Sequence, residues 1–428
     1  MNSQYDELAR AMRAAVLPRL DLDTVERLVD DRQNLAKEIG AAIQQISVET
    51  KRYLPSEEMQ KLAFAIADEI GGVGPLRDLM DDNSVSDILV NGPDNIFIET
   101  RGKLVKTDKR FIDNDQLTEI AKRLVSRVGR RIDESQPLVD ARMSDGSRLN
   151  VVIPPIALDG TAISIRKFSN VSRTFNDLVA WGAMDERMAN FLSIAARCQV
   201  NIVISGGTGS GKTTLLNALS HYIGNDERII TLEDAAELKL QQPHVVRLET
   251  RMAGVENSGQ VNMRDLMINT LRMRPDRIIV GECRGGETFE MLQAMNTGHD
   301  GSMTTLHANS PRDALARMEN MVMMANLNLP VEAIRRNISS AVNLIVQASR
   351  LHDGSRKITH ISEIMGQEGE VIVLQDIFNF EVSDSSEPGT VSGSFVTSGL
   401  SMRSAVYRKA KEHACDGYLK TLFSDYHA

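Results

Sequence analysis

The stretch that decides the fold is Gly206-Gly207-Thr208-Gly209-Ser210-Gly211-Lys212-Thr213, a complete G-x-x-x-x-G-K-[ST] phosphate-loop pattern. The β-branched run 201–205 before it is typical of a buried parallel strand, and residues 214–219 after it begin a helix. Glycines let the backbone curl so that several N–H groups point inward, and the dipole of the following helix adds positive potential. The sequence therefore predicts a site for the phosphates of a nucleotide.

Within this stretch, Lys212 is expected to reach the β- and γ-phosphates, and the hydroxyl of Thr213 is expected to hold Mg²⁺. The cofactors predicted from the motif are therefore ATP and Mg²⁺. The residues predicted to bind the nucleotide are Gly206, Gly207, Thr208, Gly209, Ser210, Gly211, Lys212, Thr213 and Thr214.

Length and composition limit the function classes. A chain of 428 residues exceeds the usual single-core size, so two or three domains are expected. With 49 basic and 58 acidic residues the net charge is −9, which argues against nucleic acid as a partner because a strongly basic face is its usual signature. The three cysteines are widely spaced, which favours a reducing, cytoplasmic location and excludes a CxxC zinc site.

Neither a secretory signal nor a membrane span is predicted from the sequence. Residues 1–13 lack an apolar segment, and no apolar run approaches the roughly 20 residues that a transmembrane helix needs. Any association with a membrane is therefore expected to go through a partner protein.

The periodicity of apolar residues divides the chain into five predicted parts. Residues 1–71 read as helical, and 72–168 as an α+β domain with short strands and one helix from about 114 to 128. The polar stretch 169–180 is interpreted as a linker. Residues 181–381 alternate strands with helices, as in an α/β domain with a mostly parallel sheet. Residues 382–428 are predicted to be a variable tail, with a Ser- and Gly-rich mobile part at 382–399 and one terminal helix from about 402 to 423. In the α/β part the predicted strands are 201–205, 228–232, 277–281, 302–306 and 342–347, followed by a closing pair at 357–363 and 371–380.

Two acidic groups follow predicted strands of this sheet. The run 277–280 is apolar and leads into Gly281-Glu282, a Walker B pattern in which the usual aspartate is replaced. The run 229–232 leads into Glu233 and Asp234. Carboxylates at the carboxyl ends of neighbouring parallel strands lie beside the phosphate loop, where they can orient Mg²⁺ through water or polarise an attacking water. The alternative for Glu233 and Asp234 is that one of them caps the next helix.

Histidines and arginines supply the remaining candidates. His307 follows the strand-like run 303–306, so it is expected at the same edge, where an imidazole could sense the γ-phosphate; a structural histidine is the alternative. His299 has weaker support. Charge on the transferred phosphoryl group is often neutralised by an arginine from another domain or subunit. Arg148 and Arg166 lie on strands before the linker, and Arg272 and Arg284 flank the Walker B strand.

Taken together, these motifs resemble the type II/IV secretion ATPases, and among them the CpaF-like motors of tight-adherence (Tad, type IVb-like) pili. The boxes that carry the resemblance are the phosphate loop, Thr231-Leu232-Glu233-Asp234, Val280-Gly281-Glu282, and the histidine box from Thr297-Gly298-His299 to Thr305-Leu306-His307-Ala308-Asn309. Shorter matches in the α+β part are Gly74-Pro75-Leu76, Val90-Asn91-Gly92-Pro93 and Gly146-Ser147-Arg148-Leu149-Asn150. The resemblance covers roughly residues 72–380.

This resemblance implies a RecA-like P-loop domain after an α+β domain, with a homo-hexameric ring and ATP between the two domains. It implies that Glu282 is the Walker B catalytic glutamate, Glu233 the acid-box glutamate and His307 the histidine near the γ-phosphate. Arg148 and Arg166 would reach the nucleotide, and Glu282 would approach Mg²⁺ through water. The implied partners are inner-membrane platform proteins of a pilus or secretion system, which would hold the cytoplasmic motor at the membrane.

Three functions remain open from the sequence alone. The first is a motor for pilus assembly, retraction or secretion. The second is a RecA-like ATPase that translocates another partner, such as DNA. An aromatic content of 4% argues against DNA, because it provides few side chains on which bases could stack. The third is a nucleotide-gated scaffold with little turnover.

Overall fold

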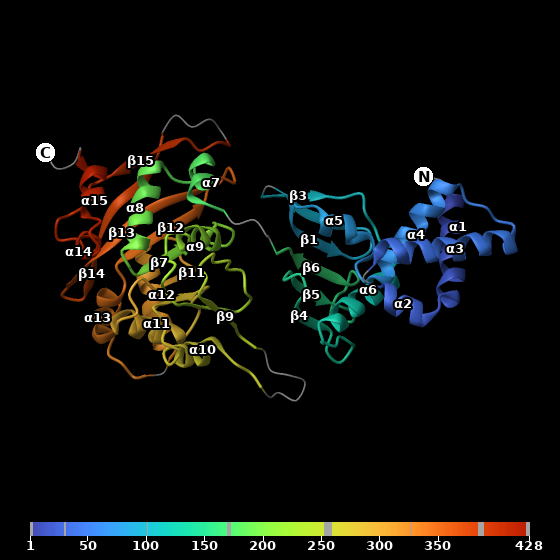
Figure 1. Ribbon diagram of the computed structural model, residues 1–428, viewed down its shortest axis with the longest axis horizontal. Coiled ribbons are helices and arrows are strands. Elements are labelled where there is room, and N and C mark those ends of the chain that lie inside the picture. The colour runs from blue at the N-terminus through green and yellow to red at the C-terminus, as the bar shows by residue number, and fades with distance from the viewer. Residues whose placement is uncertain are drawn as a thin grey trace. The chain divides into compact units, whose positions relative to one another are not determined.

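The computed structural model describes residues 3–29, 31–100, 102–168, 173–251, 259–325, 327–383 and 389–424. The chain forms two compact units, residues 1–170 and residues 171–428, each of which is described by itself (Figure 1). Within these described residues, no helix combines the length and apolarity that crossing a membrane requires.

Helices make up the first part of the first unit. They are α1 (Ser3–Val16), a 3₁₀ turn (Leu17–Arg19), α2 (Leu22–Leu28), α3 (Arg32–Thr50) and α4 (Ser56–Ile70). The apolar stripe predicted across residues 22–46 is shared by two helices, because Asp31 caps a new helix by accepting a hydrogen bond from the backbone N–H of Asn34. Ile39 and Ile43 of α3 pack against Ile66 of α4.

The remainder of the first unit is an antiparallel sheet of six strands in the order β3-β2-β1-β6-β5-β4. Its elements are a 3₁₀ turn (Gly74–Leu76), α5 (Arg77–Asp81), β1 (Val85–Asn91), β2 (Ile96–Thr100), β3 (Lys103–Lys106), α6 (Asn114–Arg127), β4 (Leu138–Arg142), β5 (Arg148–Val152) and β6 (Ala162–Arg166). Alternate residues such as Ile88, Ile163 and Leu149 are buried in one core with Leu117 and Ile120 of α6. Edge strand β4 was not predicted, since Val139 is its one fully buried residue.

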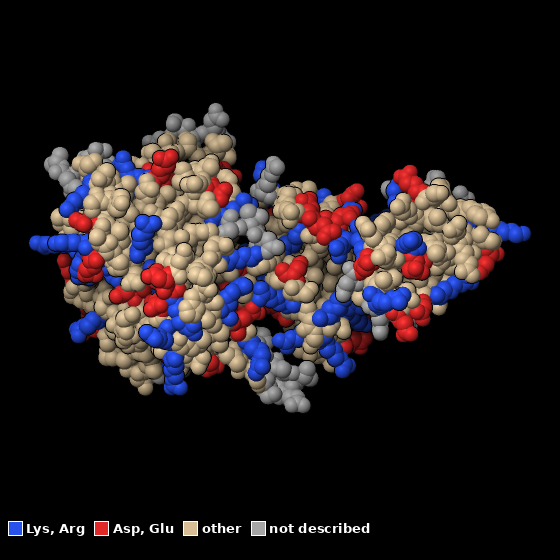
Figure 2. All heavy atoms as spheres, viewed as in Figure 1, with Lys and Arg blue, Asp and Glu red and all other residues tan. Residues whose placement is uncertain are grey.

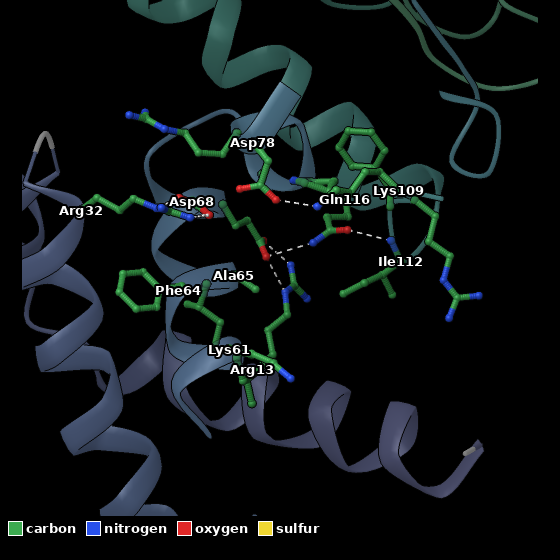
Figure 3. A pocket seen from close by; sticks show the side chains of 18 of the residues that line it. Arg13, Arg32, Lys61, Phe64, Ala65, Asp68, Asp78, Lys109, Ile112 and Gln116 are labelled. Atoms are coloured by element: carbon green, nitrogen blue, oxygen red, sulfur yellow. Dashed lines mark hydrogen bonds and ion pairs between the residues drawn. The ribbon is translucent and has the colours of Figure 1, made fainter. Parts of the chain in front are cut away.

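Ion pairs join these helices to one another, and a hydrogen bond from a neutral glutamine joins them to the sheet part. Glu69 of α4 accepts hydrogen bonds from Arg13 of α1 and from Gln116 of α6, and Asp68 pairs with Arg32 of α3 (Figure 3). These residues line a pocket of about 840 Å³. Residues 1–71, which were predicted as a separate segment, therefore form one unit with the α+β part.

The second unit contains a sheet of nine strands in the order β15-β14-β13-β12-β7-β11-β10-β8-β9. The strands are β7 (Ile202–Gly206), β8 (Ile229–Glu233), β9 (Val245–Glu249), β10 (Arg277–Val280), β11 (Met303–Leu306), β12 (Leu344–Arg350), β13 (Arg356–Glu368), β14 (Val371–Val382) and β15 (Gly393–Thr397). The six strands from β12 to β9 run parallel, and β13 to β15 add antiparallel neighbours. The predicted α/β architecture is thus confirmed, with β9 as an edge strand that was not predicted.

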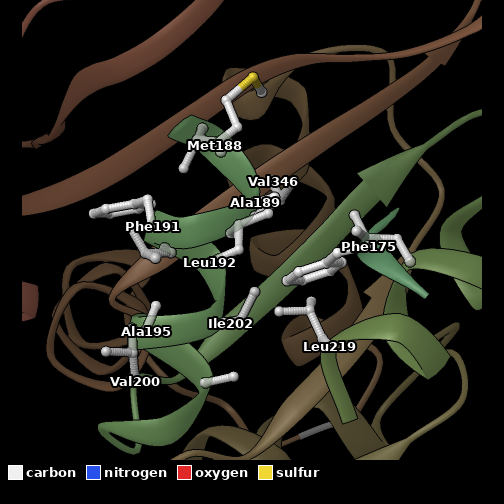
Figure 4. Close-up of a cluster of buried hydrophobic side chains, with 14 of the residues drawn as sticks. Phe175, Met188, Ala189, Phe191, Leu192, Ala195, Val200, Ile202, Leu219 and Val346 are labelled. Carbon is white, nitrogen blue, oxygen red and sulfur yellow. The ribbon is translucent and has the colours of Figure 1, made fainter. Parts of the chain in front are cut away.

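Helices cover both faces of this sheet. They are α7 (Phe175–Ala180), α8 (Glu186–Arg197), α9 (Lys212–Ser220), α10 (Met263–Thr270), α11 (Glu287–Asn296), α12 (Pro311–Met323), α13 (Val331–Ala341), α14 (Ala405–Glu412) and α15 (Asp416–Leu422). Ile202 and Ile204 of β7 face the core with α8 and α9, part of which Figure 4 shows, whereas Val203 faces the core with α10 to α13. Burial on both faces explains why β7 reads as a continuous apolar run.

The interpretation of 169–180 as a linker is wrong for its second half. Residues 175–180 form α7, which begins with a capping box between Thr174 and Asp177. Phe175 and Leu178 are buried in the core of the second unit, and the Phe175 ring stacks on Tyr222 with 4.8 Å between centroids. Residues 169–172 lie outside the described residues. Six residues are too few for apolar periodicity to reveal the helix.

The prediction of a mobile tail after residue 382 also needs correction. β15 pairs with β14, and the predicted single helix consists of α14 and α15, separated by Ala414 with a φ of 55°. Val406, Leu419 and Phe423 are buried in the same core as α8. Residues 384–388 and 425–428 lie outside the described residues. The Ser- and Gly-rich composition hid a segment in which Leu400, Val406 and Leu419 are buried in the core.

Candidate active site

The sheet of the second unit brings the predicted groups to one edge. Strands β7, β11, β10 and β8 are neighbours in that order and run parallel. The phosphate loop follows β7, His307 follows β11, Glu282 follows β10, and Glu233 ends β8. Carboxyl ends of parallel strands meet at one sheet edge, which is where open α/β sheets bind ligands.

Close packing and backbone conformation shape the phosphate loop. A Cβ on Gly206 would lie 2.3 Å from the carbonyl oxygen of Ala348 on β12, so only glycine fits against that strand. Gly209 and Gly211 have φ angles of 70° and 97°, in the left-handed region that favours glycine. Gly211 directly precedes α9, whose first turn presents its backbone N–H groups to the loop.

Two side chains of the loop fit a phosphate ligand. Lys212 Nζ donates to the carbonyl oxygens of Gly206 and Gly207, both at 3.0 Å, so its ammonium lies inside the loop. Ser210 Oγ is buried without a hydrogen-bond partner in the described part of the chain. A buried hydroxyl without a partner is costly, and a phosphate oxygen would satisfy it. Thr213 and Thr214, in the first turn of α9, complete the predicted set.

His307 connects the phosphate loop to the Walker B glutamate. Its Nδ1 lies 3.5 Å from Lys212 Nζ, and its Nε2 lies 3.2 Å from Glu282 Oε1. Burial and the charge of Lys212 lower the pKa of His307 below its usual value, which favours the neutral ring. Because an ammonium can only donate, Nδ1 is the acceptor and Nε2–H donates to Glu282.

Arg284 and Asp234 continue this chain of contacts. Arg284 NH2 donates to Glu282 Oε2 at 2.9 Å, and NH1 lies 3.3 Å from Asp234 Oδ2. The pKa of Arg284 is raised, and its hydrogen bond to Glu282 is the largest cause. Glu282 thus has one oxygen on a neutral histidine and the other on a cation, so both oxygens of its carboxylate are held in place.

Glu233 lies at the same edge but is buried. Its Oε2 accepts hydrogen bonds from the backbone N–H groups of Glu237 at 2.7 Å and Leu238 at 2.8 Å. Its Oε1 is buried without a partner in the described part of the chain. Burial raises the pKa of Glu233 to about 7, against the lowering effect of the two backbone bonds.

The glycine of the unusual Walker B pattern also has a structural reason. A Cβ on Gly281 would lie 3.0 Å from Cγ of Glu233, so the glycine leaves the space that the Glu233 side chain occupies. Gly281 also donates its backbone N–H to Leu232 and accepts a hydrogen bond from Thr305 Oγ1. These contacts join the ends of three neighbouring strands, β8, β10 and β11, around Gly281.

Other candidates lie elsewhere. His299 precedes β11 and Arg272 precedes β10, so both are at the amino ends of their strands, opposite to His307 and Glu282. Arg148 and Arg166 belong to the sheet of the first unit, where they are direct cross-strand partners on β5 and β6. Both alternate with residues of the buried core, so they share the sheet face that points away from it.

One contact of the loop was missed from the sequence. Arg356, the first residue of β13, donates from Nε to the carbonyl oxygen of Gly209 at 2.8 Å. The turn Leu351-His352-Asp353-Gly354-Ser355 is a hairpin signal that could have located it. On the visible face of each unit, Figure 2 shows acidic and basic side chains interspersed. The distribution of surface charge therefore does not by itself point to Arg356 as a contact of the loop.

Comparisons with known proteins support the ATPase activity that was predicted from the sequence. Residues 69–375 match the family described as type II/IV secretion system protein. Over 309 residues, 71% of this chain and 87% of the relative, the chain is 37% identical to a Mycobacterium tuberculosis protein whose name assigns it, provisionally, to conjugal transfer. It is 33% identical over 318 residues to the type IV secretion system protein VirB11 of Brucella abortus, covering 68% and 87% of the two chains. The crystal structure of the VirB11 ATPase of Brucella suis matches 68% of this chain and 96% of its own at 30% identity, with a TM-score of 0.37. The chain belongs to the type II/IV secretion system protein family.

Proposed function

We propose that this chain is a motor that couples ATP hydrolysis to pilus assembly, pilus retraction or secretion across the bacterial envelope, as in tight-adherence (Tad) pili. The observation that carries the proposal is the series of contacts from Lys212 through His307 to Glu282. This series ties the group that would hold the γ-phosphate to the carboxylate that would activate water. A scaffold that only binds nucleotide would not need such a connection.

Glu282 is the group we propose to polarise the attacking water. Its side chain is 20% exposed, so water can reach it, and Arg284 and His307 fix its two oxygens. Glu233 is less suited, because its residue is 2% exposed and one oxygen is already used by two backbone N–H groups. We propose that Glu233 shapes the loop 234–238 beside the site.

Lys212, Thr213 and the backbone N–H groups of the loop would bind the phosphates. Lys212 would exchange the loop carbonyls for the β- and γ-phosphate oxygens, and Thr213 Oγ1 would hold Mg²⁺, with Glu282 near it through water. Mg²⁺, when bound, neutralises charge that develops on the transferred group. Movement of Lys212 would also change its contact with His307. The presence or loss of the γ-phosphate would therefore affect the position of Glu282.

Arg148 and Arg166 are proposed to supply positive charge to the terminal phosphate. Their direct cross-strand pairing on β5 and β6 supports this role, since it places two guanidinium groups on the same face of the sheet. Asp87 is the cross-strand neighbour of Arg166 on β1.

The proposed assembly is a homo-hexamer in the cytoplasm that reaches the inner membrane through platform proteins of the pilus or secretion system. Hydrolysis would change contacts between domains, and a ring would let successive steps act on one partner. The family assignment supports this. The relatives named for conjugal transfer and type IV secretion favour, as a second candidate, a secretion motor that acts on another partner.

The variants Lys212→Ala and Glu282→Gln should lose most Mg²⁺-dependent ATP hydrolysis, measured as phosphate release. Glu282→Gln is expected to lower kcat by roughly 10²- to 10⁴-fold while nucleotide binding remains, since it removes a general base and keeps the shape of the side chain. Lys212→Ala should weaken binding as well. Hydrolysis by Glu282→Gln at the parental rate would contradict the catalytic assignment.

The pKa of Glu233 predicts an unusual pH dependence of stability. A carboxyl whose folded pKa is raised from 4.5 to about 7 stabilises the fold fully below pH 4.5 and loses that contribution as pH rises through 7. The loss amounts to about 3 kcal/mol. Glu233→Gln should remove it, so the urea midpoint of the variant relative to the parent should rise between pH 5 and pH 8. Parallel midpoint curves for the two proteins would refute this.

Substitution of the proposed arginine pair should affect turnover more than binding. Arg148→Ala and Arg166→Ala are expected to lower kcat by roughly 10³-fold, because arginines that stabilise a transferred phosphoryl group contribute on that order. Arg131→Ala is a matched control in the same unit, since its side chain is 83% exposed. Parental kcat in both pair variants, measured alongside an unchanged oligomer mass, would exclude them from the site.

Deletion of the gene separates the two candidate functions. A Tad motor is expected to leave cells without surface pili in electron micrographs, and the parental gene should restore them, whereas the Glu282→Gln gene should not. Intact pili together with loss of a secreted protein would favour the type IV secretion candidate instead.

A further inference from the structure

The hairpin of β12 and β13 ends beside the phosphate loop, on the side away from the hydrolytic residues. β7, which leads into the loop, lies between β12 and β11 in the sheet. His307 and Glu282 follow β11 and β10, so they occupy one flank of the loop. The tip of the hairpin, residues 351–355, belongs to the opposite flank.

Two arginines of this hairpin lie against the loop. Arg350 and Arg356 are direct cross-strand partners that enclose the turn. Arg356 Nε donates to Gly209 at 2.8 Å, and its Cδ would lie 3.7 Å from a Cβ on Gly211. NH1 of Arg350 would lie 3.7 Å from a Cβ on Gly209. Both guanidinium groups are therefore at the glycines that curl around a phosphate.

The tip that carries these arginines is held in place. Asp353 accepts hydrogen bonds from Ser355 N at 2.9 Å and Ser355 Oγ at 2.6 Å, and from the backbone N–H of Val391 at 3.0 Å. At the base, Ile358 donates its backbone N–H to Ala183 at 2.8 Å. A site built on a fixed hairpin loses little entropy when it orders a ligand.

Charge indicates what kind of ligand this arrangement suits. Arg350 and Arg356 place two guanidinium groups beside the loop, and Lys212 adds a third basic group within it. The bond to Gly209 uses one of the five N–H donors of Arg356. Arginine forks bind phosphate oxygens through two parallel hydrogen bonds, so guanidinium groups at a glycine-rich loop suit a phosphate ligand.

The direction of the nucleotide follows from the hydrolytic residues and rests on the proposed function. If Glu282 activates the water, the γ-phosphate lies on the β11 flank, and a triphosphate that crosses the loop must leave with its α-phosphate toward β12. We propose that Arg350 and Arg356 form a second anion-binding arm of the nucleotide site, which holds the α-phosphate of ATP and ADP alike. This arm secures the nucleotide through hydrolysis, when the contacts to the γ-phosphate are lost.

The test is calorimetric titration of the full chain with Mg²⁺–ADP and Mg²⁺–ATP. For Arg350→Met combined with Arg356→Met, both affinities should fall by the same factor, roughly ten- to hundredfold, because two charge-assisted hydrogen bonds are lost. KM should rise in parallel while kcat stays near the parental value. Arg356→Lys, which keeps the charge without the fork, should recover part of the affinity, and Arg336→Met on α13, with a side chain 75% exposed, is the matched control.

Three outcomes would overturn the proposal: unchanged ADP affinity in the double variant, loss of ATP affinity alone, or a lowered Tm of the protein without nucleotide while affinity is retained. The last would mean that the arginines only brace the loop. Binding of ADP does not require turnover, so a parent that binds ADP without hydrolysing ATP would refute the motor while the arginine comparison could still be made.

Discussion

The hydrogen bonds of one neutral imidazole hold the active site of the second unit together. His307 accepts from Lys212 and donates to Glu282, so it requires a protonated Nε2 and an unprotonated Nδ1 at the same time. Its lowered pKa satisfies this requirement at neutral pH. Glu282 accepts the bond from the ring with one oxygen and the bond from Arg284 with the other. The phosphate loop and the Walker B strand thereby share one polar chain.

The sheet makes this chain possible. Four neighbouring parallel strands each end in one member of the site, and their spacing of about 4.8 Å brings side chains from residues far apart in sequence into hydrogen-bonding distance. Close packing adds to this, since Gly206 lies against β12 with no room for a side chain. The loop is therefore fixed from both flanks, by β11 with its histidine and by β12 with its hairpin.

Sequence patterns predicted which groups meet at this sheet edge, because a residue that follows a parallel strand lies at the carboxyl end of that strand. The apolar runs before Gly206, Glu282 and His307 are buried on both faces, and such runs are easily recognised. Strands β4 and β9 were missed because edge strands bury few residues, and α7 because six residues are too short for helical periodicity. The burial of Glu233 and the approach of Arg356 depend on tertiary contacts with residues 237–238 and 209, which no local pattern contains.

The space at Gly281 bears on how acidic sites of this type can change over time. An aspartate at this position, as in the usual Walker B strand, would place its Cβ 3.0 Å from Cγ of Glu233, so the Glu233 side chain would have to move by a few tenths of an ångström. That movement would act on the hydrogen bonds that Glu233 Oε2 accepts from Glu237 and Leu238. A substitution on β10 is therefore coupled to the loop that follows β8, and a second change in that loop would ease the exchange of one arrangement for the other.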